Sequence, residues 1–202
     1  MALQITTASE TNYNPVFLEI LSEVPGGGTI ATDRVPGTCK VLEEGTMLAN
    51  SNTDGVYQFV KTGVVASSGG ATVTHYLLKA PAHFIAGEFL SVAGGCTSAT
   101  IASVTRATNT VTVVADACLG ALVTAGAVVF EGTGTTATGN STGKYLPSLM
   151  LKNTVEVRSA DYTTLQNVFS GIVNRANVDE SNMPYFPTTV QKANMTDYFL
   201  FA

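Results

Sequence analysis

Short runs rich in β-branched and aromatic residues recur along this chain, and glycine, asparagine or proline separates them. Runs of this length with frequent turn residues are typical of an all-β barrel or sandwich. The runs occupy 14–21, 55–66, 73–80, 88–93, 100–105, 110–115 and 126–131. We therefore predict a mainly β fold.

Two turn patterns support this interpretation. The segment 100–115 predicts a hairpin with its tip at 108–109, because asparagine tolerates positive φ in tight turns. Gly45, Gly87 and Gly126 each stand between an apolar run and a new strand. We expect left-handed or strained backbone there, as glycine allows. The flanking segments differ, so this is a reused turn and not a tandem repeat.

Helical spacing is rare in the sequence. One or two helical turns are predicted at 115–126, and a short helix at 187–195. The segment 162–177 has apolar residues at helical spacing, but a strand pair bent at Gly171 fits nearly as well, so both remain open. The Gly/Thr-rich segment 131–144 is predicted to be an exposed loop.

Composition limits the partners of the chain. Its 202 residues suit one medium domain, or one domain with an elaborated subdomain. Only 12% of residues are charged, against about 25% in a typical soluble domain, which favours a surface partly covered by partners. The formal charge is −5 without a basic run, so we expect neither nucleic acid nor anionic lipid as partner. We also expect no secretory signal and no membrane span.

The cysteines are Cys39, Cys96 and Cys118, an odd number without metal-ligand spacing. Free, mostly buried thiols in a reducing compartment are the simpler interpretation, and one disulfide stays open. A cysteine nucleophile would need one of them beside His75 or His83. The sequence does not exclude such a pair, and nothing in it favours one.

The two histidines lie eight positions apart in the stretch "HYLLKAPAHFIAGEFLSV". They would share a strand face only in an unbroken strand, and Pro81 interrupts the strand. We therefore place His75 and His83 on separate elements and expect no metal site. In this interpretation Pro81 and Gly87 turn the chain, and His83 is a polar cap on the corner between two strands.

Motifs for nucleotide binding and hydrolysis are incomplete. The segment 139–145 has one residue too few for a phosphate-binding loop, and 132–137 leaves no room for the helix of a dinucleotide site. A G-x-S-x-G elbow is missing, and the acidic pairs 43–44 and 179–180 resemble solvated turn charges. We expect no enzyme activity and no cofactor.

Three consecutive segments resemble a known family: "APAHFIAGEFLSV" (80–92), "TIASVTRATNTVTV" (100–113) and "ALVTAGAVVFE" (121–131). Their order of corner, hairpin and turn is similar to that of the head-decoration, or capsid-cementing, proteins of tailed bacteriophages. The resemblance extends over roughly 35–187, with the loop 131–144 as an insertion.

This resemblance implies a small β-barrel or β-tulip-like domain with short helices, in which an extended N-terminal arm (1–15) precedes one β-rich domain (16–202). It implies a homotrimer bound to the major capsid protein on the outside of the virion and made in the bacterial host cytoplasm. Leu3, Ile5 and Tyr13 of the arm would then contact the capsid.

Two alternatives remain. One is a head-fibre base or another virion structural subunit. The other, from a different class, is a carbohydrate-binding β-domain. Such domains stack sugars on exposed aromatic rings, and this chain has no Trp and seven scattered tyrosines.

Overall fold

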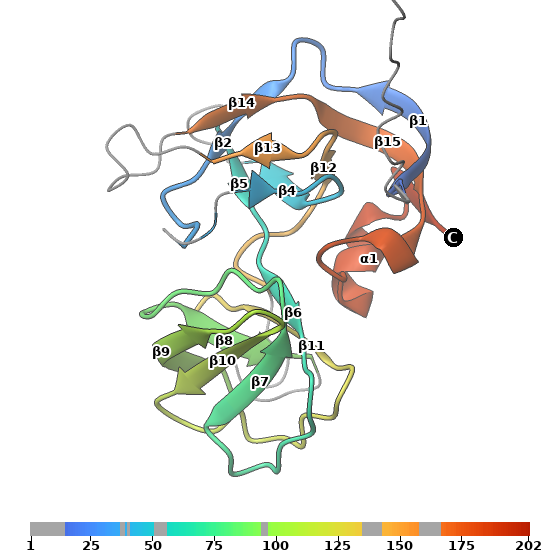
Figure 1. The fold of residues 1–202 in the computed structure, drawn as a ribbon. Coiled ribbons are helices and arrows are strands. Elements are labelled where there is room, and N and C mark those ends of the chain that lie inside the picture. The colour runs from blue at the N-terminus through green and yellow to red at the C-terminus, as the bar shows by residue number, and fades with distance from the viewer. Residues whose placement is uncertain are drawn as a thin grey trace, which may run out of the picture.

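A computed structural model describes residues 15–36, 39, 41–50, 56–93, 97–134, 143–157 and 167–202. This part of the chain is mainly β, as predicted, with one short α-helix and one short 3-10 helix (Figure 1). Of the predicted arm only Pro15 belongs to it, so Leu3, Ile5 and Tyr13 lie outside the described residues.

The first sheet has eight strands in the order β1-β15-β12-β4-β5-β2-β14, with β16 also paired to β15. Its strands are β1 (Phe17–Glu23), β2 (Gly28–Ala31), β4 (Met47–Asn50), β5 (Val56–Phe59), β12 (Leu149–Leu151), β14 (Val168–Ser170), β15 (Ile172–Val178) and β16 (Phe199–Phe201). Beside it, β3 (Val41–Leu42) pairs with β13 (Val155–Glu156).

This sheet curls into a half-barrel, and its two end strands, β1 and β14, are linked through the bent ribbon of β14 and β15 (Figure 1). β14 and β15 are separated only by Gly171; β15 pairs with β1, and β14 pairs with β2. The described part of 162–177 is therefore a bent strand pair, and the alternative of a helix there is wrong. Along β15, Ile172, Ala176 and Val178 are buried and share one face, which turns to the core, whereas Arg175 on the other face is exposed.

The second sheet has six strands in the order β6-β11-β8-β9-β10-β7. Its strands are β6 (Thr62–Val64), β7 (His75–Lys79), β8 (Phe89–Val92), β9 (Ala99–Arg106), β10 (Thr110–Ala115) and β11 (Val128–Glu131). All of them lie between β5 and β12 in the sequence. We call residues 62–131 the inserted lobe, and the other described residues the host lobe.

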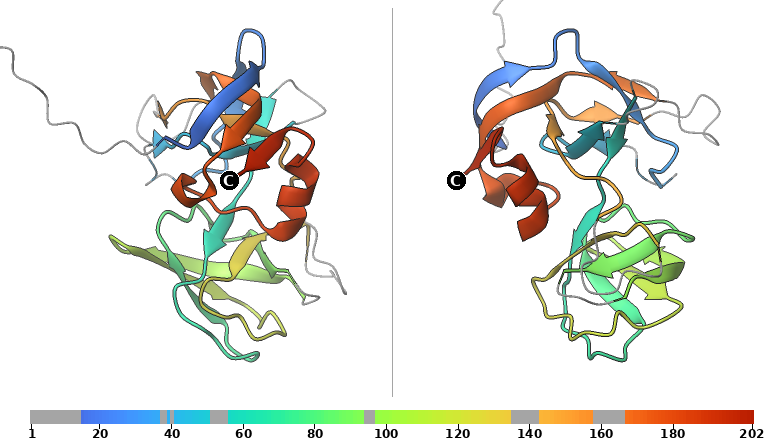
Figure 2. Two further views of the ribbon diagram at one scale, coloured as in Figure 1. Left: turned by 90° about the vertical axis from the view of Figure 1, so that its right-hand side faces the viewer. Right: turned by 180° about the vertical axis from the view of Figure 1, so that it is seen from behind.

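Each lobe has its own hydrophobic core, and the two lie side by side in the views of Figure 2. In the host lobe the core includes Met47, Leu48 and Ile172; in the inserted lobe it includes Leu78 and Val113, and all five side chains are fully buried. The β-rich unit predicted over 16–202 is thus built as two lobes. The chain enters the inserted lobe between β5 and β6 and has returned to the host lobe by β12.

The repeated glycine turn is present at all three places. Gly45, Gly87 and Gly126 have φ of +77°, +89° and +87°. In each turn the N–H of the next residue donates to the carbonyl three residues earlier in the chain. A left-handed third residue with this hydrogen bond is the geometry of a type II turn, which explains the requirement for glycine.

Among the local predictions, the hairpin of β9 and β10 and the C-terminal helix α1 (Thr189–Met195) are confirmed. Thr188 and Gln191 cap α1 with reciprocal side-chain bonds to backbone N–H groups. The helix predicted at 115–126 is wrong: Gly120 is left-handed, and Val123 bridges to Gly69 as an extended residue.

The ends of the Gly/Thr-rich loop meet at a bridge between Gly132 and Gly143, and residues 135–142 lie outside the described part. No helix among the described residues is long and apolar enough to cross a membrane.

Candidate functional site

The two histidines occupy different environments. His75 opens β7 and is exposed, whereas His83 follows the cis Ala80–Pro81 peptide bond and is only 8% exposed. The break at Pro81 separates them, in agreement with the sequence. The environment of His83 lies mostly in the other lobe, which the sequence does not indicate.

His83 joins the lobes through aromatic contacts. Its ring centroid lies 5.6 Å from that of Phe59 and 5.3 Å from that of Tyr185, and both partners belong to the host lobe. Phe59 and Tyr185 also pack edge to face, with centroids 5.4 Å apart. Aromatic contacts of this kind add about 0.5–1.5 kcal/mol each beyond the burial of their area. His83 is therefore a packed residue of the junction between the lobes.

A cysteine of the host lobe lies beside this imidazole. The Cys39 sulfur is 3.5 Å from Nε2 of His83, and the thiol donates to the carbonyl of Val41 at 3.1 Å. Both residues line a cavity of about 130 Å³ that also includes Pro81 and Arg106. The structure thus brings together the cysteine–histidine pair that the sequence left open.

The electrostatics of this pair oppose nucleophilic catalysis. Burial, with smaller contributions from the Lys61 and Arg106 charges, lowers the pKa of His83 to about 4. Burial also raises the pKa of the Cys39 thiol. At neutral pH the pair is therefore a thiol and a neutral imidazole, whereas cysteine enzymes require a thiolate. The arrangement packs the junction and does not activate the sulfur.

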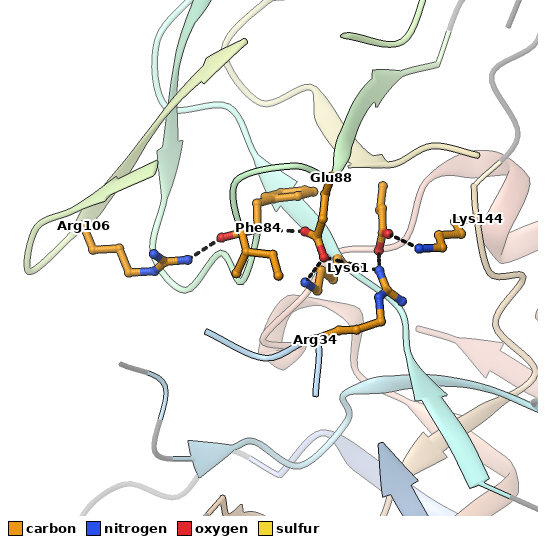
Figure 3. Close-up of polar contacts among 8 residues, drawn as sticks. Arg34, Lys61, Phe84, Glu88, Arg106 and Lys144 are labelled. Atoms are coloured by element: carbon orange, nitrogen blue, oxygen red, sulfur yellow. Dashed lines mark hydrogen bonds and ion pairs between the residues drawn. The ribbon is translucent and has the colours of Figure 1, made fainter. Parts of the chain in front are cut away.

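A second group of polar contacts at the junction is ionic (Figure 3). Arg34 of the host lobe pairs with Glu131, and its Nη2 lies 3.4 Å from Oε1 of Glu88. Lys61, at the first crossing between the lobes, also pairs with Glu88, and Lys144 Nζ lies 3.1 Å from Oε1 of Glu131. We call these five residues the junction ion cluster.

Three members of the junction ion cluster are shielded from water, whereas Arg34 is 16% and Lys144 is 40% exposed. Exposed fractions of the side chains are 0% for Lys61, 3% for Glu131 and 8% for Glu88. Buried charges require partners, because removing one leaves the other desolvated and uncompensated. Glu88 is also held by the backbone N–H of Ile85, which donates to its Oε2 at 3.0 Å. The cluster fixes how the two lobes meet.

Sequence reasoning missed the junction ion cluster, although one of its members carried a signal. Lys61 is the only charge in the apolar run 55–66, and a lone charge in such a run suggests a buried, paired group. Nothing local identifies its partner. Glu43 and Glu44, by contrast, lie at the turn predicted for them.

Exposed apolar side chains gather on the outer strands of the host sheet. Leu18 and Leu21 of β1 are 57% and 54% exposed, Phe169 of β14 is 68% and Leu200 of β16 is 67%. β1 and β14 are the two ends of the strand order, and β16 pairs with β15 on one side. Free edges with apolar residues are places where sheets add strands or meet partners.

In the part of the chain that the structure describes, no group of three or more His, Cys, Asp or Glu side chains could hold a metal ion. The described residues form a mainly β, two-lobed protein, and four of its exposed apolar residues lie on the outer strands β1, β14 and β16. No family model matches the sequence, and no curated protein or solved structure matches it.

Proposed function

We propose that this chain is a structural virion protein that binds the outside of a bacteriophage capsid and reinforces the shell across capsomer borders. Its partners would be the major capsid protein and copies of itself, in a homotrimer. The observation that carries the proposal is the set of exposed apolar residues on the edge strands β1, β14 and β16.

The edge strands give the proposal a physical mechanism. A free edge offers unpaired backbone groups to a neighbouring strand, and Leu18 and Leu21 would give apolar contact next to it. Both leucines lie at register shifts of β1 against β15, where bulges leave them outside the regular pairing. Small interfaces repeated by symmetry reinforce a shell through multivalency.

The junction between the lobes supports a structural role in preference to an enzymatic one. The Cys39–His83 pair is held in its uncharged form, and the junction ion cluster is internally paired. These groups rigidify the subunit, which suits a protein that has to transmit load between capsomers.

The test is whether the protein co-purifies with virions, and at what copy number relative to the major capsid protein. We expect a fixed ratio for the wild type and a loss of about ten-fold for Leu18→Asp/Leu21→Asp. Leu122→Asp is the control, since Leu122 is an even more exposed leucine (66%) that lies on the inserted lobe, away from these edge strands. Absence of the wild type from virions would refute the proposal. Clear binding on a glycan array would instead favour the carbohydrate-binding alternative.

A further inference from the structure

A second cavity lies between the lobes, and neither Cys39 nor His83 lines it. It encloses about 200 Å³. Its inserted-lobe wall consists of β6 and residues 79–81, and its host-lobe wall consists of residues 183–186. We call it the seam cleft, because it lies where the two ends of the six-stranded sheet separate.

The separation is visible in the pairing of β6 and β7. Val65 and Leu78 form a bridge, and the N–H of Ala66 donates to the carbonyl of Leu77 at 2.7 Å. From this point toward residues 62 and 81, β6 and β7 are not neighbours in the sheet. Pro81 has no N–H with which to continue the pairing. The two end strands of the six-stranded sheet, β6 and β7, thus meet at the Val65–Leu78 bridge and separate beside the cleft.

A buried hydroxyl group of the cleft wall lacks a partner. Thr62 is 0% exposed, and its Oγ1 finds no hydrogen-bond partner. Side chains alternate along β6, and a Cβ at Gly63 would meet Leu78 and Phe84 in the inserted core. Thr62 and Val64 therefore point away from that core and toward the cleft. A buried hydroxyl without a partner is unfavourable in a folded protein, and it leaves this part of the cleft wall with an unused hydrogen-bond donor.

The size and lining of the cleft limit that occupant. Its volume of about 200 Å³ far exceeds the roughly 30 Å³ of one water, and it is smaller than the ~300–1,000 Å³ of ordinary ligand pockets. The lining is mostly apolar, with Val64, Pro81, Met183 and Phe186 among its residues, and Lys79 is its one charged side chain. These properties fit a short extended segment with apolar side chains and a carboxylate.

We propose that residues 1–14 of the same chain supply this segment and dock in the seam cleft. The point at which they join the fold lies next to the cleft wall, because Nδ2 of Asn182 donates to the carbonyl of Pro15 at 3.3 Å and Asn182 directly precedes Met183. Ten extended residues span about 33 Å, so the length of the segment is sufficient.

The composition of residues 1–14 matches the cleft. Leu3 and Ile5 are two positions apart and share one side of an extended chain. Glu10 is the only charged side chain of the segment and complements Lys79. The docking does not depend on the proposed function. If the subunit also binds a capsid through Leu3 and Ile5, the cleft and the capsid would compete for these two side chains.

Hydrogen exchange on the purified full-length protein tests this docking without any capsid. Deleting residues 2–12 is expected to raise the exchange rates of the amides at 62–64 and 185–186 by about ten-fold or more, with unchanged exchange in the hairpin of β9 and β10. A synthetic peptide of residues 1–14, added to the truncated protein, should bind one to one and restore the slow exchange. A scrambled peptide should do neither.

Point variants in the full-length chain separate docking from general destabilisation. Leu3→Ser/Ile5→Ser should reproduce the deletion, and the matched control Gln4→Ala/Thr6→Ala, on the other side of the extended segment, should behave as wild type. Val64 is a half-buried residue of the cleft wall, so the larger side chain of Val64→Phe should fill the cleft and abolish peptide binding. Identical exchange in full-length and truncated protein would refute the proposal. Protection that rises with protein concentration would also refute it, because the segment would then come from a second copy.

Discussion

The Cys39 sulfur and Nε2 of His83 lie 3.5 Å apart, and the two residues belong to different lobes. This contact, together with the junction ion cluster, makes the packing of the lobes depend on groups that burial keeps in defined charge states. The stability of the junction can therefore be measured through those groups.

The first prediction concerns the free energy of unfolding at acidic pH. The pKa of His83 is about 4 in the folded protein, below its ordinary value of 6.5, because the ring is buried. As the pH falls, the unfolded chain takes up this proton before the folded chain does. Stability due to the neutral imidazole is thus complete above pH 6.5 and is lost as the pH falls to about 4. The loss is about 3 kcal/mol.

Urea unfolding between pH 7 and pH 4 measures this loss. Between these pH values the free energy of unfolding of His83→Gln should fall by about 3 kcal/mol less than that of the wild type. His75→Gln, at an exposed position, should follow the wild type throughout. Parallel curves for His83→Gln and wild type would contradict the prediction.

The second prediction concerns the pair of Glu88 and Lys61. Glu88→Gln should lower the free energy of unfolding by about 3 kcal/mol, because it leaves the fully buried Lys61 without its carboxylate. Adding Lys61→Met should recover part of this loss, since the uncompensated charge is then removed. Denaturant unfolding of both single variants and the double variant gives the coupling energy.

The matched control for this pair is Glu23→Gln. Glu23 pairs with Lys152 at 2.6 Å, but the two side chains are 40% and 34% exposed. Water and salt weaken such a pair, so the expected loss is below about 1 kcal/mol. Equal losses for Glu88→Gln and Glu23→Gln would show that the junction ion cluster is not effectively buried.

The third prediction concerns the repeated turn. Gly87→Ala should cost about 1 kcal/mol, because φ is +89° and the added Cβ meets nothing within 4 Å, so only the backbone conformation opposes it. Gly45→Ala should cost more, since its Cβ would lie 2.5 Å from a methyl group of Val16. Gly70→Ala, in open space and outside the left-handed region, should be neutral or slightly stabilising in thermal unfolding.

The fourth prediction links the N-terminal segment to assembly. Deleting residues 2–12 should leave a folded subunit that no longer adds to shells, because the proposed capsid contacts Leu3 and Ile5 are removed. Circular dichroism checks the fold, and sedimentation with purified capsids checks the binding. Truncated protein that still saturates capsids would show that this segment is not the anchor.

Local features of the fold could be predicted from the sequence because their causes are local. The hairpin of β9 and β10, helix α1 and the left-handed glycines each follow from residues within one turn of each other. The helix predicted at 115–126 was wrong for a related reason. Its alanines and leucines favour helix, but Gly120 and the pairing of Val123 with Gly69 determine the backbone.

The candidate sites could not be predicted in the same way, since they join distant residues. Arg34 and Glu131 are 97 positions apart, and Cys39 and His83 are 44 apart. Periodicity and spacing describe one element at a time. They do not indicate that the strands between β5 and β12 form a lobe of their own, whose contacts with the host lobe bury these groups.

The strand β15 has a mechanical consequence. Val178 pairs with Phe17 of β1 on one side and with Phe201 of β16 on the other, so Phe17 and Phe201, near the two ends of the described chain, lie about 10 Å apart. Tension applied at residues 17 and 201 would cross three neighbouring strands of the host lobe and would bypass the inserted lobe. A subunit tethered by its ends could be stretched without straining the junction between its lobes.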